Sequence, residues 1–217
     1  MKTLKQEYIE FLSDSFFKGF QLRKPLFYNW DFGLRFDLQI GETNTDEYFH
    51  EVVGRSATLF EIAFDRHDRV YFVLMEREFK RNKIRFSNYA FHQLSGLLKS
   101  EINYTKATNL YYPNDKFDKH NIAIIKLGPE RINYRNIFTA IAHSDFPQRK
   151  PRLDGLGMFT SKEVYFVNID KKLVFNMYDD RGLDIIASDL ETLRPIYTKH
   201  KNWLLEYDKT QIDKIFG

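Results

Sequence analysis

Cysteine is absent from this chain of 217 residues. Its absence excludes disulfide bonds, thiolate zinc ligands and a cysteine nucleophile, and it fits a reducing compartment. Long apolar runs are also missing, because Val70–Met75 and Ile122–Ile125 are far shorter than the roughly 20 residues of a membrane-spanning helix. Glu7, Glu10 and Asp14 interrupt the first segment, so it does not resemble a secretory signal. We therefore expect a soluble cytoplasmic protein.

Common enzyme signatures are missing as well. The sequence has no glycine-rich phosphate loop, no GxSxG elbow and no GxGxxG fingerprint. Its six histidines show neither HxH nor HExxH spacing, the arrangements that often bind metals. We therefore predict no metal and no cofactor.

Aromatic residues, in contrast, make up 17% of the chain, with 21 Phe and 13 Tyr. That content excludes intrinsic disorder, and the length allows one large domain or two small ones. Residues 1–68 carry a net charge of −4, residues 69–152 of +9 and residues 153–217 of −2. A basic middle could attract an acidic partner, although a solvated lysine and arginine face is the simpler interpretation.

Apolar periodicity and turn residues predict the secondary structure. Between 76 and 112 the pattern is ambiguous, with helical spacing near 86–98. In the C-terminal part, a turn at Asn168–Lys171 between two apolar strands indicates a β-hairpin. The predicted elements are helices at 3–18 and 45–64, strands at 34–40, 70–75, 102–112 and 122–127, a short helix from Asn133, hairpin strands around 164–166 and 173–175, and a third strand at 184–187.

Helix starts are predicted from capping residues. Asn44 is expected to begin the second helix, Ser188 with Glu191 forms a capping box, and Asp208 resembles the start of the last helix. Pro195 predicts a kink or a late start in the helix that contains it.

These elements predict an α+β fold with a mixed or mainly antiparallel sheet, helices packed on it, and a C-terminal β-hairpin followed by two short helices. Proline and glycine at 146–160 indicate a loop or linker. We predict an N-terminal α+β region at 1–145 and a C-terminal ββ(β)αα region at 161–217, packed together as one globular unit.

The segment YDDRGLDIIA is the densest polar stretch between apolar runs. Asp179, Asp180 and Asp184 could bind magnesium or manganese and act in catalysis, because these ions prefer oxygen ligands. The alternative is a structural corner, in which a carboxylate accepts backbone N–H bonds and Arg181 pairs with a neighbouring carboxylate. In that corner Gly182 would adopt a positive φ angle. We favour the structural corner.

His143 is the remaining catalytic candidate, as a general base near the end of a helix. A helix C-terminus also favours a histidine electrostatically, without any function. Arg35 and Asp37 share one face of the first strand, where they form either an exposed pair or part of a pocket floor. Arg55 lies beside an apolar helix stripe and is expected to reach past the edge of the core.

Tyrosine, tryptophan and arginine are favoured anchors of protein interfaces. The candidate binding residues are Tyr28, Trp30, Arg35, Arg55 and Arg181. Basic residues interleaved with aromatics at 77–85, and further cations at 148–152, suggest single-stranded nucleic acid as an alternative partner.

Three stretches carry a resemblance to a known family: PLFYNWDFGLRFDLQ at 25–39, GRSATLFEIAFD at 54–65 and YDDRGLDIIASDLETLRPIYTKHKNWLLEYDKTQIDKIF at 178–216. Together they are similar to a family of uncharacterised bacterial proteins with a C-terminal domain of unknown function and a YDDRGLD-type signature. The resemblance transfers no catalytic residue. By analogy it implies a small cytoplasmic immunity or accessory protein.

The leading hypothesis is therefore a non-enzymatic bacterial module that binds another protein, for example an immunity-type partner that masks a toxin or nuclease. The alternatives are a metal-dependent hydrolase acting on phosphoesters, and a nucleic-acid-binding protein that uses the basic middle region. No membrane partner is expected.

Overall fold

Seven strands form one sheet in this computed structural model, which describes residues 2–77, 83–154 and 162–217. The strand order is β1-β7-β6-β5-β2-β4-β3, and every neighbouring pair is antiparallel. The predicted α+β class with a mainly antiparallel sheet is thus confirmed. The strands are β1 (Gly33–Asp37), β2 (Val70–Arg77), β3 (Asn103–Thr108), β4 (Lys119–Leu127), β5 (Lys162–Asn168), β6 (Leu173–Met177) and β7 (Gly182–Ala187).

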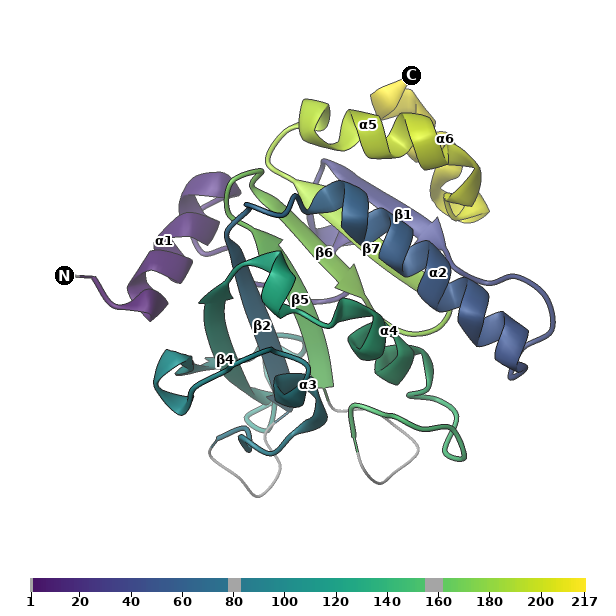
Figure 1. Ribbon diagram of the computed structural model, residues 1–217. Helices are drawn as coiled ribbons and strands as arrows, with labels where there is room; N and C mark the ends of the chain where they lie inside the picture. Colours follow the sequence, from purple (N-terminus) through teal and green to yellow (C-terminus); the bar gives the residue numbers. More distant parts are fainter. Residues whose placement is uncertain (1, 78–82, 155–161) are drawn as a thin grey trace.

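Helices cover both faces of this sheet, unequally. In Figure 1, α2 and α4 lie in front of the strands, α5 and α6 lie beside β1 and β7, and α1 lies at the other end of the molecule. The helices are α1 (Leu4–Ser15), α2 (Asp46–Ala63), α3 (Tyr89–His92), α4 (Tyr134–Ala142), α5 (Leu190–His200) and α6 (Glu206–Phe216), with single 3-10 turns at Phe27–Asn29, Lys99–Glu101, Pro129–Arg131 and Lys201–Trp203. None of the described helices combines the length and apolar character needed to cross a membrane.

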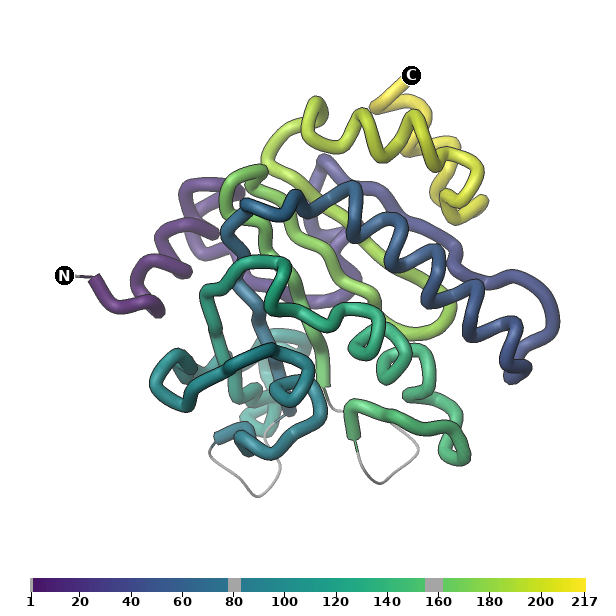
Figure 2. The backbone as a smooth tube through the Cα atoms, in the orientation of Figure 1, coloured from purple at the N-terminus to yellow at the C-terminus, as the bar shows by residue number. Residues whose placement is uncertain are grey.

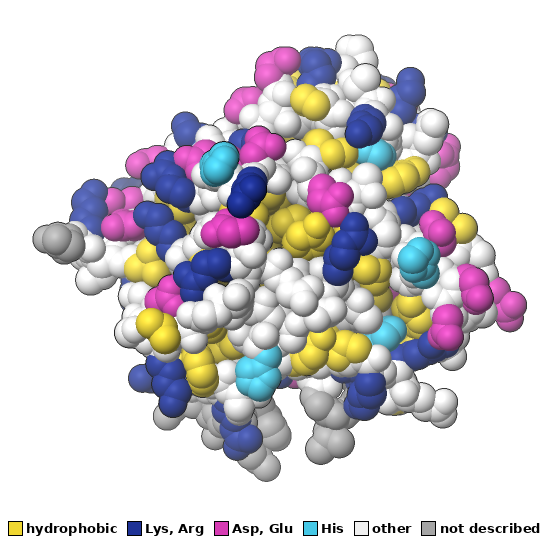
Figure 3. All heavy atoms as spheres, viewed as in Figure 1, with side chains coloured by type: hydrophobic (Ala, Val, Ile, Leu, Met, Phe, Trp, Pro, Cys, Tyr) yellow, Lys and Arg dark blue, Asp and Glu magenta, His cyan; other side chains and the backbone are white. Residues whose placement is uncertain are grey.

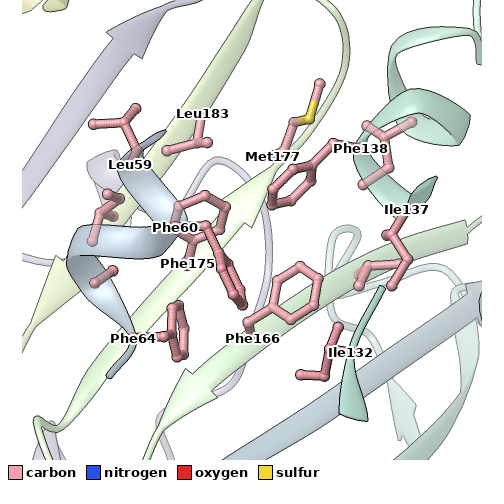
Figure 4. Packing of buried hydrophobic residues seen from close by; sticks show 14 of the residues in the cluster. Leu59, Phe60, Phe64, Ile132, Ile137, Phe138, Phe166, Phe175, Met177 and Leu183 are labelled. Carbon is pink, nitrogen blue, oxygen red and sulfur yellow. The ribbon is translucent and has the colours of Figure 1, made fainter. Parts of the chain in front are cut away.

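A cluster of phenylalanine rings forms the core between the sheet and its front helices (Figure 4). Phe60 of α2 lies 5.1 Å from Phe166 of β5 and 5.5 Å from Phe175 of β6, measured between ring centroids. Phe138 of α4 stacks on Phe175 at 5.6 Å. All four rings are buried. Edge-to-face and stacked pairs add to the hydrophobic effect of burial, so this layer is the main source of packing energy.

The opposite face of the sheet is covered by α1 and by the chain that follows it. Tyr8 of α1 packs edge-on against Tyr71 of β2 at 5.4 Å. Residues Phe20, Leu22 and Leu26 continue this second core toward β6 and β7. The tube in Figure 2 shows this N-terminal segment passing behind the sheet before it enters β1. The segment therefore covers one end of the sheet with a single 3-10 turn and no α-helix.

The sheet joins strands from distant parts of the sequence. The early strand β1 pairs with β7, and β2 pairs with β5, so the three strands from 161–217 lie between β1 and β2 in one sheet. Of the predicted linker at 146–160, residues 155–160 lie outside the described residues.

Three helix starts differ from their predictions. Thr45, not Asn44, caps α2, because its hydroxyl accepts the N–H of Tyr48. Asp189 caps α5, whose first residue is Leu190, so the helix containing the proline does not start late.

The third difference is in the last helix, α6, which forms as predicted but begins at Glu206, so that Asp208 lies within its first turn. The helical spacing at 86–98 yields only the four residues of α3.

Candidate functional site

A row of polar side chains crosses three strands on the face beneath the N-terminal segment. Arg35 of β1 lies opposite Asp184 of β7, which lies opposite Asn176 of β6. Side chains alternate along a strand, so Asp184 and Asn176 share the face of Ile186 and Val174, which belong to the second apolar core. Asp184 has no exposed surface, and Asn176 is also buried. Buried polar residues in a row of this kind need partners.

Asp184 is the central residue of the row. Its Oδ2 accepts the backbone N–H of Phe27 at 3.2 Å, which ties the N-terminal segment to the sheet. Its Oδ1 lies 3.6 Å from Arg35 Nε and accepts no hydrogen bond among the described residues. Burial raises the pKa of this carboxyl to about 6, although the Arg35 charge opposes the shift. Asp184 therefore exchanges its proton close to neutral pH.

Two tyrosine rings enclose the guanidinium of Arg35. Its Cζ lies 4.8 Å from the ring centre of Tyr28 and 5.0 Å from that of Tyr178, within the range of cation–π attraction. Its Nε donates to the Tyr178 hydroxyl at 3.3 Å and lies 3.9 Å from Oδ2 of Asp208. The two carboxylates beside Arg35 thus come from β7 and from α6. Of the two settings predicted for Arg35, an exposed pair or a pocket floor, it occupies a largely enclosed one.

Tyr28 closes this arrangement from outside. Its hydroxyl donates to both carboxylate oxygens of Asp208, at 2.9 and 3.0 Å, while 53% of the residue is exposed. Burial and the bond to Asp208 raise the pKa of Tyr28. The ring is therefore held in one orientation, although much of it faces solvent.

Gly182 is required here for a different reason from the predicted one. Its φ angle is not positive, because Gly182 starts β7 and pairs with Asp37 in the sheet. A Cβ atom at this position would lie 1.8 Å from the hydroxyl oxygen of Tyr178. Glycine therefore provides the space in which Tyr178 folds back over its own turn to reach Arg35.

The acidic side chains of the corner have separate partners. Asp179 accepts the backbone N–H of Arg181 at 2.8 Å and its Nε–H at 2.9 Å. Asp180 is buried and accepts the hydroxyl of Tyr48 at 2.5 Å. Burial raises the pKa of Asp180. Together with Asp184, these carboxylates point to different parts of the fold, and no group of three acidic or histidine residues in the described chain is arranged to hold a metal ion.

His143 lies at the C-terminal end of α4. Its Nδ1 is 3.0 Å from the carbonyl oxygen of Pro151, and its ring packs edge-on against Phe49 at 4.6 Å. Burial lowers the pKa of His143, so the neutral imidazole is favoured. These contacts fix the loop after α4, and none of the recorded contacts of His143 is to the three corner carboxylates.

Arg55 and Trp30 each bind a backbone carbonyl group, at opposite ends of the β1–β7 pair. Arg55 donates to the carbonyl oxygen of Asp37 at 2.9 Å and lies 5.0 Å above the ring of Trp203. This bond covers part of the exposed edge of β1, where unpaired backbone would otherwise invite association. Trp30 donates its indole N–H to the carbonyl of Ala187 at 2.7 Å.

Beyond Asn176 the strands β5 and β6 move apart and no longer pair. Strands β5 and β6 pair over only three residues, and Asn176 then bridges the gap by donating to Val164 O at 2.9 Å. The gap encloses a cavity of about 10 Å³, room for about one water molecule. Its polar lining consists of Lys24, Ser144, Lys162, Glu163, Asn176 and Tyr178. The side chains that form the polar row therefore occupy nearly all of the space beside it.

Sequence reasoning missed Asn176, Tyr178 and Asp208 as members of this site. Asn176 had a usable signal, because it interrupts the apolar strand LVFNM where a buried side chain was expected. Asp208 had been interpreted as a helix start, and only the packing of α6 against β1 brings it to Arg35.

The comparisons with known proteins place this chain in a family. The model of a domain of unknown function, DUF3885, matches residues 9–208, which is most of the chain. The chain therefore belongs to this family, and the match includes the N-terminal segment as well as the C-terminal strands. It is 26% identical over 202 residues to the uncharacterized protein YnaE of Bacillus subtilis (strain 168), a match that covers 88% of this chain and 94% of that protein. No solved structure matches it.

Proposed function

We propose that this protein is a non-enzymatic protein-binding module of the bacterial immunity or accessory type, and that its partner contacts a surface centred on Tyr28. One observation carries this proposal. Tyr28 is 53% exposed, yet both of its ends are fixed, the hydroxyl by Asp208 and the ring by Arg35.

A fixed, exposed aromatic side chain is well suited to binding. An interface that orders a mobile side chain loses about 0.5–1.5 kcal/mol of affinity for each one, and Tyr28 is already ordered. Tyrosine and arginine are also enriched among the residues that dominate binding energy. Tyr207, in the first turn of α6 and next to Asp208 in the sequence, is a second highly exposed tyrosine, with 87% of the residue exposed.

The enclosed state of the polar row supports a binding role over catalysis. A reaction centre requires space for a substrate within hydrogen-bond reach of its acid and base. Here the space between β5 and β6 is about 10 Å³, and the corner carboxylates are bound by Arg181, Tyr48 and the Phe27 amide.

Affinity capture from the native host tests the proposal. The tagged protein is used as bait, partners are identified by mass spectrometry, and the best candidate is purified and titrated by calorimetry. We expect Tyr28→Ala to weaken binding at least tenfold, because the anchor is lost. A partner that is a toxin or nuclease should lose its activity in the complex.

Matched variants distinguish the loss of a contact with the partner from a loss of folding. Tyr112→Ala removes a comparably exposed tyrosine from the loop at the opposite edge of the sheet, and it should leave binding of this partner unchanged. Circular dichroism must show that the Tyr28 variant is folded. Equal affinity of the Tyr28→Ala and wild-type proteins would contradict the proposal. A melting temperature that rises with magnesium or manganese, or a turnover abolished by Asp180→Ala, would favour the hydrolase hypothesis instead.

A further inference from the structure

The loop between β3 and β4, residues 109–118, exposes two aromatic rings. Tyr112 is 61% exposed and Phe117 is 69% exposed. Single exposed apolar residues are common on protein surfaces, but two large rings on one ten-residue loop form a local feature that needs an explanation.

Hydrogen bonds within the loop hold the backbone that carries these rings. The buried carboxylate of Asp118 accepts the backbone N–H groups of Tyr111 at 2.6 Å and of Tyr112 at 2.8 Å. Burial alone would raise the pKa of Asp118, but these two bonds, together with the nearby charges of His120 and Arg77, lower it, so Asp118 stays ionised. Asp115 donates its N–H to the carbonyl of Tyr112 at 3.0 Å, and Asn109 donates its N–H to the carbonyl of Asp118 at 2.8 Å. The rings are therefore presented from a closed loop.

The charges that face outward around these rings are positive. Lys116 places its Nζ 5.1 Å from the ring centre of Phe117, and Lys119 is exposed at the start of β4. Arg77, at the end of β2, lies 4.0 Å from the carboxylate of Asp115. That carboxylate also accepts the N–H of Phe117 at 2.8 Å, so the acidic groups of the loop are engaged internally.

The other basic stretch, residues 148–152, does not extend the basic surface around the 109–118 loop. Arg149 packs 4.9 Å from the ring of Phe49 and pairs with Asp46, and the buried Arg152 donates to the carbonyl of Ser144 at 2.5 Å. Over the face shown in Figure 3, cationic and acidic side chains are interspersed, as on a solvated surface. Of the basic stretch at 77–85, residues 78–82 lie outside the described residues.

We propose that the 109–118 loop, together with Arg77 and Lys119, binds single-stranded nucleic acid. Unpaired bases stack on exposed aromatic rings whatever their sequence, and nearby lysine and arginine side chains neutralise the phosphates. Lys116 places a cation next to the ring of Phe117, on which a base would stack. A second ring–cation pair, Tyr104 with Lys83 at 5.6 Å, lies on β3, five residues before the loop begins. This surface is independent of the one around Tyr28, which lies near β1 at the other edge of the sheet.

Fluorescence anisotropy with a labelled oligothymidylate and the full-length protein tests this inference. We expect binding whose logarithmic affinity falls linearly with the logarithm of the salt concentration. The double variant Tyr112→Ala/Phe117→Ala should weaken binding at least tenfold with little change in that slope, since the rings carry no charge. Lys116→Ala should reduce the slope by about 1.

A control and two contrary outcomes complete the test. Phe17→Ala removes an exposed aromatic ring near Trp30, outside the loop, and should not change the affinity. Absence of binding at low salt, with all variants folded by circular dichroism, would overturn the proposal. Equal binding of polyglutamate and of the oligonucleotide, unaffected by loss of the rings, would also overturn it and would assign the surface to an acidic protein.

Discussion

The two faces of the sheet are built on different principles, although the same strands supply both. In β6, Phe175 points toward α2 and α4, whereas its neighbour Asn176 points toward the N-terminal segment. The front face is a close-packed layer of aromatic rings. The other face changes from the apolar contacts of Tyr8 with Tyr71 to the buried charges of Arg35 and Asp184.

The difference between the two faces indicates which of them serves only the stability of the fold. Aromatic packing stabilises a fold through area and shape, with little demand on individual partners. Buried charges contribute little net stability, and often cost stability compared with apolar residues of the same volume. Stability alone therefore does not explain the cluster of Arg35, Asp184 and Asp208, whereas the proposed function does, because Arg35 and Asp208 hold Tyr28 in place.

The largest effect is expected on the aromatic face. Phe166→Ala removes a buried ring that contacts Phe60, Phe72 and Phe138, and it should lower the free energy of unfolding by about 3–5 kcal/mol. Urea denaturation followed by circular dichroism measures this loss. Phe166→Leu, which keeps most of the volume, should lose clearly less. A loss below about 1 kcal/mol for the alanine variant would mean that this layer is not the main core.

A somewhat smaller effect is expected on the polar face. Arg35→Leu leaves the buried carboxylates of Asp184 and Asp208 without their cation, which should cost about 3 kcal/mol at neutral pH. Adding Asp184→Asn removes one of those charges and should recover part of the loss. The same urea titration measures both variants. If the double variant is as unstable as the single one, the cost arises from lost packing with Tyr28 and Tyr178 and not from charge.

The sequence predicted the fold well where one face of an element is apolar. Strand 70–75 and helix 45–64 appear as β2 and α2 because their burial follows the apolar pattern. It failed at 86–98, where Phe91 and Leu94 are buried although the helix has only four residues. There the apolar side chains reach the core from turns. The spacing of apolar residues alone cannot distinguish a helix from a series of turns.

The candidate site was only partly predictable for a related reason. The dense polar corner was visible, and so was the choice between a metal site and a structural turn. The contact of Arg35 with Asp184 and Asp208 was not, because it depends on β1 pairing with β7 and on α6 packing against β1. Long-range pairing of this kind leaves no trace in local periodicity.

An intermediate effect is expected at the glycine that joins the corner to the polar row. Gly182→Ala should cost about 1–3 kcal/mol, since the new methyl group must displace the hydroxyl of Tyr178 or shift β7. Thermal unfolding measures the loss. Combining it with Tyr178→Ala, which empties the contested space, should make the glycine substitution nearly neutral. If alanine costs as much in that background, the strain lies in the backbone and not in the tyrosine.

The smallest effect is a pH dependence of the free energy of unfolding, which arises from Asp184 on the polar face. The folded-state pKa of Asp184, about 6, lies above the usual aspartate value of about 4, so the folded protein binds this proton more tightly than the unfolded chain does. Its contribution to stability therefore increases as the pH falls through 6, and it is lost above that pH. Between about pH 7.5 and about pH 5 the wild type should gain about 1 kcal/mol relative to Asp184→Asn, whose amide does not titrate. Urea titrations of both proteins at the two pH values measure this difference, from which all other titrating groups cancel. A difference that stays constant with pH would mean that Arg35 keeps Asp184 ionised, and the polar face would then be a fixed ion pair like those on the surface.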